Sequence, residues 1–401
     1  MWDWSEAAAA ALVGGHTAVS RVDVLHNGTP VYVLAVTGGR VGMDAHRPVR
    51  ANVSCALIDP TGRLSRGDVD DLLSPYDCEI QPWRGVALSS TRVAYQPSPT
   101  AGFGGTELGI PVVTRSSSVE LAPLGVFGLT GRTVTDSPDG LAIALAGQDR
   151  AMGFQGPMSS ALAIPGGTPV EAAITRLLLT RRPGLSLLAM DTGFTCGPLL
   201  FPPDIDVWAE AQKLAESVGV RLFHDRLGRC VLAPAGPASG SPVARYAEGA
   251  GLLLSVDRAE DADTIRNVVV AESPDGRIRV EVADTDPSSP TSVGGRFGRR
   301  VAPPLVHPFT SHEQARQAAM ARLVHELGRS ETVAFTAIVN PGLDVDEVVT
   351  VHRPRAGLVD RGVIVATLDV PLSVKEPMQV VCRQSRLAQD GRGLPPTELA
   401  A

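Results

Sequence analysis

Aromatic residues are scarce in this sequence, at 4% of the chain, so its cores have to be filled by Val, Leu, Ala and Ile. Valine fits the pleated, half-buried surface of a β-strand. The 41 glycines and 32 prolines supply many turns. At 401 residues the chain is also longer than one ordinary domain. The composition therefore predicts several units built from many short strands and tight connections.

Lysine is almost absent, with only Lys213 and Lys375, and the net charge is -7 with a pI near 5.7. The arginines gather only locally, as in Arg299 and Arg300. Nucleic acids attract long cationic surfaces, and no basic stripe of that kind is present. The sequence therefore predicts no specific nucleic-acid recognition. A conduit that must not bind its cargo is compatible with such a balance.

Cysteine is limited to five residues, odd in number and without a CxxC pair. This spacing supports neither a disulfide framework nor a zinc ribbon. We expect reduced, mostly buried thiols and assembly in a reducing cytoplasm. Long hydrophobic runs are also missing. The apolar stretch 7–13 follows Asp3 and Glu6 and is short, so it predicts a helix ended by Gly14 and Gly15 rather than a signal peptide or membrane span.

Signatures of catalysis are missing as well. The sequence has no GxSxG elbow and no GxxxxGK[ST] loop. His312–Glu313 and His325–Glu326 each begin like a zinc-protease helix, but neither has a second histidine four residues later, so we interpret them as exposed helix residues. His224–Asp225 and His26 are interpreted as turn residues.

Glycine pairs and acidic runs complete the search for chemistry. Gly104–Gly105 and Gly294–Gly295 do not lie between a strand and a capped helix, so they predict loops. The acidic runs lack EF-hand spacing, and we interpret them as solvated turn residues. These acids are Asp68, Asp70 and Asp71, and Asp344, Asp346 and Glu347. The sequence predicts no catalytic, cofactor-binding or metal-binding residue and no cofactor, so the chain is predicted not to be an enzyme.

Residues 1–150 predict an antiparallel β unit behind the short N-terminal helix. Val22 and Val24 share one face before Asn27–Gly28, the strongest short hairpin signal. Val53, Cys55 and Leu57 repeat the period of two in the strand expected over 49–58. Residues 89–118 are polar and rich in Gly, Ser and Thr, and predict an exposed loop.

Residues 151–240 predict a small α/β insert. Thr168 and Glu171 form a capping-box pattern with Pro169 at the first helical position. A second helix is expected over 207–218, and a hairpin over 220–223 and 229–232. The Pro, Gly, Ser and Ala residues of 234–242 predict a linker.

Residues 241–390 predict a second β domain with one helix over about 312–327, followed by a flexible tail over 391–401. Thr310 and Ser311 are alternative caps for that helix, with Glu313 or Gln314 at the third position. A hairpin is expected around 273–276, and strands over 333–339, 347–352 and 362–370.

Several segments of the first 150 residues resemble the minor tail, or tail-hub, proteins of actinobacterial phages. The residues that carry this resemblance are 22–25, Gly42-Met43-Asp44 ahead of Arg50, 72–76, Glu79-Ile80, 83–86 and 123–127. The second half resembles the wider baseplate-hub group more loosely. There an Ala- and Arg-rich helix and a strand precede 340–344, which leads into 348–351.

The resemblance implies a mainly β fold with two tube-like antiparallel β-barrel units flanking the α/β insert. It implies a homotrimeric, pseudo-sixfold ring that joins the tail tube to the tip and lets DNA or tape-measure protein pass. The implied partners are a distal tail or tail tube protein, the tape measure protein and tail tip or fibre proteins, with no stable membrane association. The implied location is the virion, after assembly in the bacterial host cytoplasm.

Three other functions stay open at this stage. A tail-associated cell-wall hydrolase would use a pair of carboxylates. A host-glycan-binding tail-tip protein would need aromatic platforms, which are scarce here. A tailocin or injection-system hub would follow the same physics as a phage hub.

Overall fold

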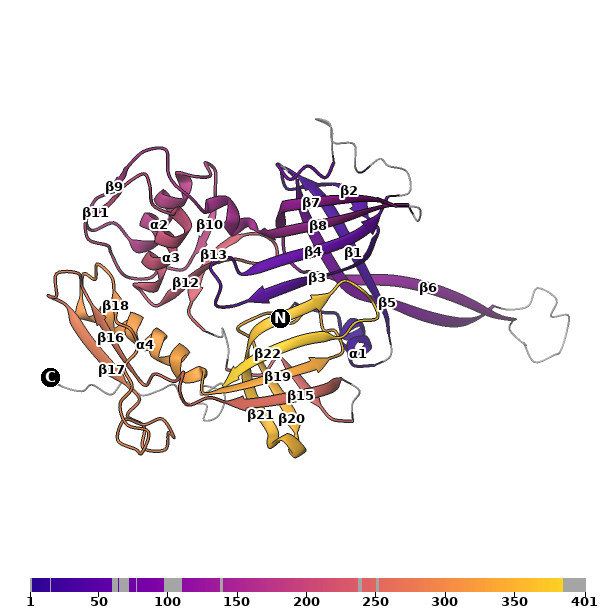
Figure 1. Ribbon diagram of the computed structural model, residues 1–401. Helices are drawn as coiled ribbons and strands as arrows, with labels where there is room; N and C mark the ends of the chain where they lie inside the picture. The colour runs from indigo at the N-terminus through magenta and orange to yellow at the C-terminus, as the bar shows by residue number, and fades with distance from the viewer. Residues whose placement is uncertain are drawn as a thin grey trace.

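The computed structural model describes residues 2–14, 16–59, 64, 72–76, 78–96, 110–137, 140–236, 240–249 and 252–384. Within these ranges the side chains of 89–96, 110–117 and 137 are not described. The predicted fold class is confirmed: the described chain is mainly β, its large sheet is dominated by antiparallel pairs, and a small α/β insert lies between its N-terminal and C-terminal strands (Figure 1).

The N-terminal part begins with one helix and continues with eight strands. These elements are α1 (Glu6–Val13), β1 (Thr17–His26), β2 (Thr29–Leu34), β3 (Val36–Asp44), β4 (Ala51–Ile58), β5 (Glu79–Gln96), β6 (Ile110–Pro123), β7 (Phe127–Ser137) and β8 (Gly140–Asp149). The predicted hairpin is confirmed, because Asn27 and Gly28 both have positive φ, 52° and 76°, as the tight turn between β1 and β2 requires. The predicted N-terminal helix is also confirmed.

The exposed loop predicted for 89–118 is wrong over its described residues. Strands β5 and β6 run through it and pair from Trp83 opposite Pro123 out to Gln96 opposite Ile110. Figure 1 shows them projecting as a long two-stranded arm. Apolar and polar residues do not alternate regularly along this stretch, so its sequence lacks the signal of a strand. Residues 97–109 lie outside the described residues.

Helix α1 and the residues before it contact both the N-terminal strands and the C-terminal strands' part of the chain. The Trp2 amide donates to the Gly342 carbonyl at 2.9 Å, and Ser5 donates from its amide and hydroxyl to the Glu120 carboxylate. Gly342 has to be glycine here, since a Cβ would lie 2.2 Å from Nε1 of Trp4. The N-terminal segment therefore joins the first β strands to the last ones.

The insert consists of two helices and short strands around its own core. Its elements are η1 (Arg150–Phe154), β9 (Leu162–Ile164), α2 (Val170–Leu179), β10 (Leu187–Ala189), β11 (Leu199–Phe201), α3 (Val207–Glu216), β12 (Val220–His224) and β13 (Cys230–Pro234). The apolar faces predicted for both helices are buried, including Ile174 and Trp208. The predicted hairpin of β12 and β13 is confirmed.

The capping box predicted at the start of α2 is wrong. Pro169 occupies the cap position, and no side chain caps the helix. The Thr168 hydroxyl donates instead to the Pro165 carbonyl at 2.7 Å, while the Glu171 carboxylate accepts from the Thr192 hydroxyl at 2.9 Å. The motif is shifted by one residue from the register it needs, because Pro169 takes the position expected for Thr168.

The C-terminal part supplies nine strands and the last helix. These elements are β14 (Ala244–Ala247), β15 (Leu253–Glu260), β16 (Val268–Glu272), β17 (Arg279–Ala283), β18 (Leu305–Val306), α4 (His312–Gly328), β19 (Glu331–Ala337), β20 (Val348–Arg353), η2 (Pro354–Ala356), β21 (Leu358–Pro371) and β22 (Met378–Gln384). Ser311 is the cap of α4, and its hydroxyl accepts from the Gln314 amide. Strands β16, β17 and β18 form a separate three-stranded sheet, and its core packs against α4.

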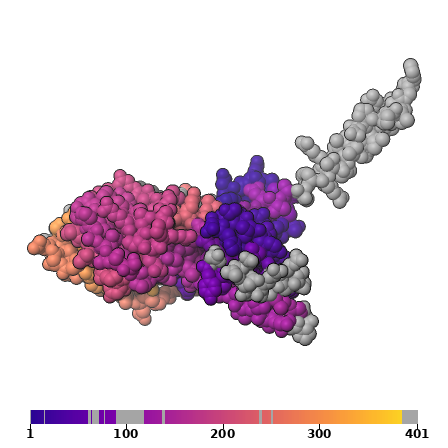
Figure 2. All heavy atoms as spheres, turned by 90° about the horizontal axis from the view of Figure 1, so that it is seen from above, coloured from indigo at the N-terminus to yellow at the C-terminus, as the bar shows by residue number. Residues whose placement is uncertain are grey.

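One continuous sheet joins the N-terminal and C-terminal strands. Strands β21 and β3 pair antiparallel, from Thr367 opposite Asp44 to Pro371 opposite Arg40. A single hydrophobic core then includes residues of both parts, such as Val53 and Phe335. Figure 2 shows the insert and the unit of α4 together at one end of the molecule and the indigo N-terminal strands towards the other.

All five cysteines are buried, as predicted. Among the described residues, no helix combines the length and the apolar character needed to cross a membrane. The predicted boundaries of independent domains stay a prediction.

Candidate functional site

One face of the continuous sheet is exposed over much of its length. Along it the strands follow the order β15-β19-β22-β21-β3-β4-β8-β7, and every neighbouring pair is antiparallel. Side chains alternate between faces, so Val53, Cys55 and Leu57 enter the core while Asn52, Ser54 and Ala56 are exposed. Strand β8 alternates in the same way. We call the outward side of these eight strands the open face.

The open face is made mainly of small and uncharged side chains. In the half formed by β3, β4, β8 and β7 it carries Gly38, Arg40, Gly42, Asn52, Ser54, Ala56, Ile58, Thr133, Thr135, Ala142, Ala144, Ala146 and Gln148. In the half formed by β15, β19, β22 and β21 it carries Ser255, Asp257, Thr332, Ala334, Thr336, Thr367, Asp369, Gln379 and Val381. Arg40 and Asp369 neutralise each other across the joint, at 3.2 Å. Apart from Ile58 and Val381, the described part of this face therefore carries small or polar side chains and few charges.

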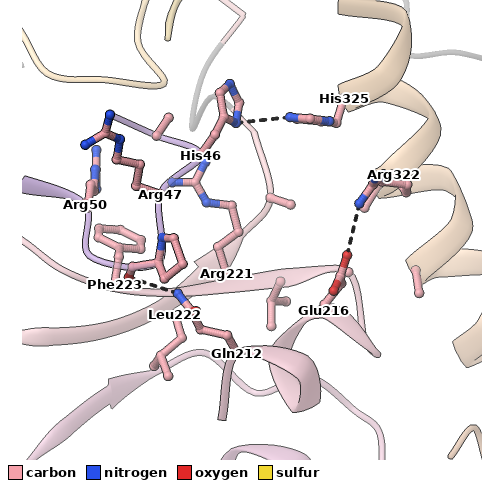
Figure 3. A pocket seen from close by; sticks show the side chains of 17 residues that line it. His46, Arg47, Arg50, Gln212, Glu216, Arg221, Leu222, Phe223, Arg322 and His325 are labelled. Carbon is pink, nitrogen blue, oxygen red and sulfur yellow. Dashed lines mark hydrogen bonds and ion pairs between the residues drawn. The ribbon is translucent and has the colours of Figure 1, made fainter. Parts of the chain in front are cut away.

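A polar junction holds the insert and α4 against the sheet. A pocket of about 320 Å³ opens between the residues after β3, the segment α3–β12 and helix α4 (Figure 3). His46, Arg50, Arg221, Glu216 and His325 are among the residues that line it. Figure 3 shows these side chains approaching from three separate parts of the chain. The junction thus depends on contacts between units that are distant in sequence.

Asp344 and Asp346 are the anionic centre of this junction, so their interpretation as solvated turn residues is wrong. Asp344 accepts from Arg50, which immediately precedes β4, and from Arg226 of the insert, each at 3.0 Å. Burial acts to raise the pKa of Asp344, but the two guanidinium groups hold it down at about 2. Asp346 pairs with Arg221 at 2.6 Å and with Arg383 at 3.6 Å.

His46 and His325 meet at the edge of the pocket. Nε2 of His325 lies 3.0 Å from Nδ1 of His46. Burial and then the charges of His46 and nearby arginines lower the pKa of His325 to about 3, and burial also lowers the pKa of His46. The interpretation of His325–Glu326 as exposed is wrong for Glu326, which is 2% exposed and accepts from Arg322 at 2.7 Å. His312 and Glu313 are exposed, as predicted.

His224 belongs to the core of the insert rather than to an open turn. Its ring stacks on Phe154 and Trp208, with centroids 5.7 Å and 5.4 Å away. Burial, followed by nearby arginine charges, lowers its pKa to about 3. The adjacent Asp225 is a turn residue as predicted, and its carboxylate accepts from the amides of Leu227 and Arg229.

Within the described ranges, no three His, Cys, Asp or Glu side chains gather in a way that would hold a metal ion. Gly294 and Gly295 lie in the loop between β17 and β18, as predicted. Asp68, Asp70, Asp71, Gly104 and Gly105 lie outside the described residues.

The sequence contains a signal for the open face that sequence reasoning missed. The run 141–146 alternates Ala with Leu or Ile, so each large residue enters the core and each alanine faces out. Alanine at three successive outward positions places only small side chains on this part of the open face. The junction left no such signal, since its arginines and aspartates are far apart in the chain.

Comparison with known proteins places this architecture among tail proteins. No family model matches the chain, and no curated protein matches it in sequence. The structure is similar to the crystal structure of the tail protein from Neisseria meningitidis MC58, with a TM-score of 0.58, 16% identity and coverage of 91% of this chain and 95% of that one. It is also similar to the 43 kDa tail protein of prophage MuSo2 from Shewanella oneidensis, with a TM-score of 0.57, 12% identity and coverage of 91% and 98%. The chain thus has the fold of phage-type tail proteins over nearly its whole length.

Proposed function

We propose that the chain is a structural hub subunit of a phage-type tail and that it acts without enzymatic activity. Three copies form a ring with near-sixfold symmetry that joins the tail tube to the tip. Its partners are a distal tail or tail tube protein, the tape measure protein and tail tip or fibre proteins. The ring is part of the virion and assembles in the host cytoplasm.

The observation that carries this proposal is the construction of the open face. Strands β15, β19, β22 and β21 form one antiparallel half, and β3, β4, β8 and β7 form the other. Two four-stranded antiparallel halves in each chain would turn three copies into six positions. Such a ring can match a sixfold tube on one side and a threefold tip on the other.

The character of the open face supports a lumen for DNA or tape-measure protein. DNA binds to surfaces that neutralise its phosphates, and each such contact adds affinity. A face of Ala, Gly, Ser and Thr, with Arg40 already paired to Asp369, offers few contacts of this kind. A long polyanion would therefore slide past without being held.

The first test is the mass of the purified full-length chain by light scattering, followed by class averages in negative stain. We expect a trimer of about three times the 41.9 kDa chain, with an open centre. A compact monomer at every concentration, alone and with a tail tube protein, would contradict the ring. Cell-wall cleavage in a zymogram that one acid-to-amide change abolishes would show the hydrolase instead, and glycan binding by a monomer would show the receptor-binding protein.

A further inference from the structure

The pocket at the polar junction has strongly cationic walls. Its described lining contains one carboxylate, that of Glu216, and four arginines, Arg47, Arg50, Arg221 and Arg322. Arg47 and Arg50 lie between β3 and β4, Arg221 is on β12 and Arg322 is on α4. Figure 3 shows Arg50 and Arg322 on opposite walls of the pocket. Guanidinium groups from separate parts of the chain therefore face one common space.

Phe223 holds the two least exposed of these arginines. The guanidinium carbon of Arg50 lies 4.4 Å from the centroid of this ring, and that of Arg221 lies 5.8 Å from it. Their side chains are only 10% and 24% exposed. Cations that an aromatic ring already orders lose little further conformational freedom when an anion arrives. These two groups are therefore preorganised for an anionic ligand.

The carboxylates behind this wall are shared between cations. Asp346 pairs with both Arg221 and Arg383, just as Asp344 serves two arginines. Even with Glu347 counted, whose carboxylate accepts from the Asp344 amide, these four arginines outnumber the acids. Nε of Arg383 is buried without a hydrogen-bond partner in the described part of the chain. A buried cation is costly unless it is matched, so an anion in the pocket would improve the balance of charge.

The protonation of Arg221 points in the same direction. Burial lowers the pKa of its guanidinium, although the carboxylate of Asp346 acts to raise it. Neither Asp344 nor Asp346 is among the described residues that line the pocket. The acids of the junction therefore lie behind the arginines, and the space in front of these arginines lacks a matching negative charge.

The size and shape of the pocket favour a phosphate group. A volume of about 320 Å³ admits a small molecule but not a nucleic-acid duplex. A planar carboxylate directs its two oxygens to one side, whereas a phosphate directs its oxygens towards several walls at once. Each arginine also presents its donors as a rigid fork, which matches the spacing of phosphate oxygens.

We propose that the pocket binds a compact multivalent phosphate anion, held by Arg47, Arg221 and Arg322. The anion contacts the segment after β3, the insert and α4 at once, so it fixes these three units in one arrangement. This inference is independent of the proposed ring, because all of its residues belong to one chain.

Titration calorimetry of the full-length chain with pyrophosphate at pH 7.5 tests the site. We expect one site per chain and a Tm that rises with pyrophosphate concentration, because a ligand that binds only the folded chain stabilises it. Citrate carries its charge on planar carboxylates and should bind about tenfold more weakly, as the loss of one charge-assisted hydrogen bond would cause. Equal affinity for citrate would overturn the phosphate class. Absence of pyrophosphate binding at millimolar concentration would overturn the site.

Three substitutions locate the bound anion. Arg221→Gln should weaken pyrophosphate binding about tenfold, because it removes a charged donor. It also breaks the ion pair with Asp346, so Arg47→Gln, at a side chain that is 68% exposed, gives a second variant without a buried contact. We expect Arg47→Gln to weaken binding about threefold. Glu216→Gln removes the carboxylate from the lining and should tighten binding.

Arg277→Gln is the matched control. It removes an exposed arginine from the turn between β16 and β17, outside the lining of the pocket, and should leave the affinity for pyrophosphate unchanged. Opposite changes in Arg47→Gln and Glu216→Gln, with no change in Arg277→Gln, support the site. Equal losses in Arg47→Gln and Arg277→Gln, or unchanged affinity in both Arg47→Gln and Glu216→Gln, would overturn it.

Discussion

Nδ1 of His46 and Nε2 of His325 lie 3.0 Å apart, and this contact joins the segment after β3 to helix α4. One ring nitrogen has to donate and the other to accept, so the bond is lost when both rings are protonated. Burial lowers the pKa of both imidazoles. The hydrogen bond between the segment after β3 and helix α4 is therefore intact at neutral pH. The folded state disfavours protonation of either ring.

Stability is expected to fall below about pH 6.5, because the unfolded chain binds protons there that the folded chain excludes. His224, 6% exposed and with a pKa of about 3, contributes about 2 kcal/mol of this loss between pH 6.5 and 5. Urea unfolding at pH 7.5 and pH 5 measures it. The variant His224→Phe should lose about that much less on acidification. The exposed His312→Gln serves as control, and equal stability of the parent at both pH values would contradict the argument.

The variant Asp344→Asn should destabilise the protein by roughly 3 kcal/mol, because it leaves Arg50 and Arg226 without their carboxylate. Urea unfolding at pH 7 checks this value. Since the pKa of Asp344 is about 2, its stabilising effect should be present above the unfolded value near 4 and disappear as pH falls towards 2. The exposed pair of Asp360 with Arg245 gives the control, where Asp360→Asn should cause no measurable change. Equal losses of stability in Asp344→Asn and Asp360→Asn would contradict the role of Asp344 as the anionic centre of the junction.

Placing arginine at Ala142, Ala144 and Ala146 should turn the open face into a DNA-binding surface. We expect the triple variant to bind duplex DNA in 50 mM salt and to lose more than tenfold in affinity at 200 mM, because phosphate contacts release counterions. Fluorescence anisotropy measures this, and the parent should not bind. Arginine at the exposed Leu179, Leu188 and Leu200 of the insert adds the same charge elsewhere. Equal DNA binding by both triple variants would argue against a lumen.

The loss of stability should differ between Ser311→Ala and Thr168→Ala, because only the first of them removes a helix cap. Ser311→Ala takes away the acceptor for the Gln314 amide and should cost about 1 kcal/mol. Thr168→Ala should cost clearly less, since its hydroxyl only donates to the Pro165 carbonyl. Thermal and urea unfolding of the two variants compare them directly. A larger loss of stability for Thr168→Ala than for Ser311→Ala would show that Thr168 caps α2 after all.

Sequence patterns predicted well those elements whose signal is local. The turn at Asn27–Gly28, the buried alternation in β4 and the helix that ends at Gly328 depend on nearby residues alone. Strands at the edges of the sheet were not predicted, because they lack such a local signal. Strand β15 is exposed on most of its length, so no apolar period marks it.

The sequence by itself determined the mainly β fold class and the burial of the cysteines, because composition and period report which side chains can leave water. Only the tertiary structure decided that β21 and β3 fuse two sets of strands into one sheet, that Asp344 is held by Arg50 and Arg226, and that one face stays open. These relationships join residues hundreds of positions apart. Pairing over such distances depends on backbone direction and packing, and the residue types alone do not predict it.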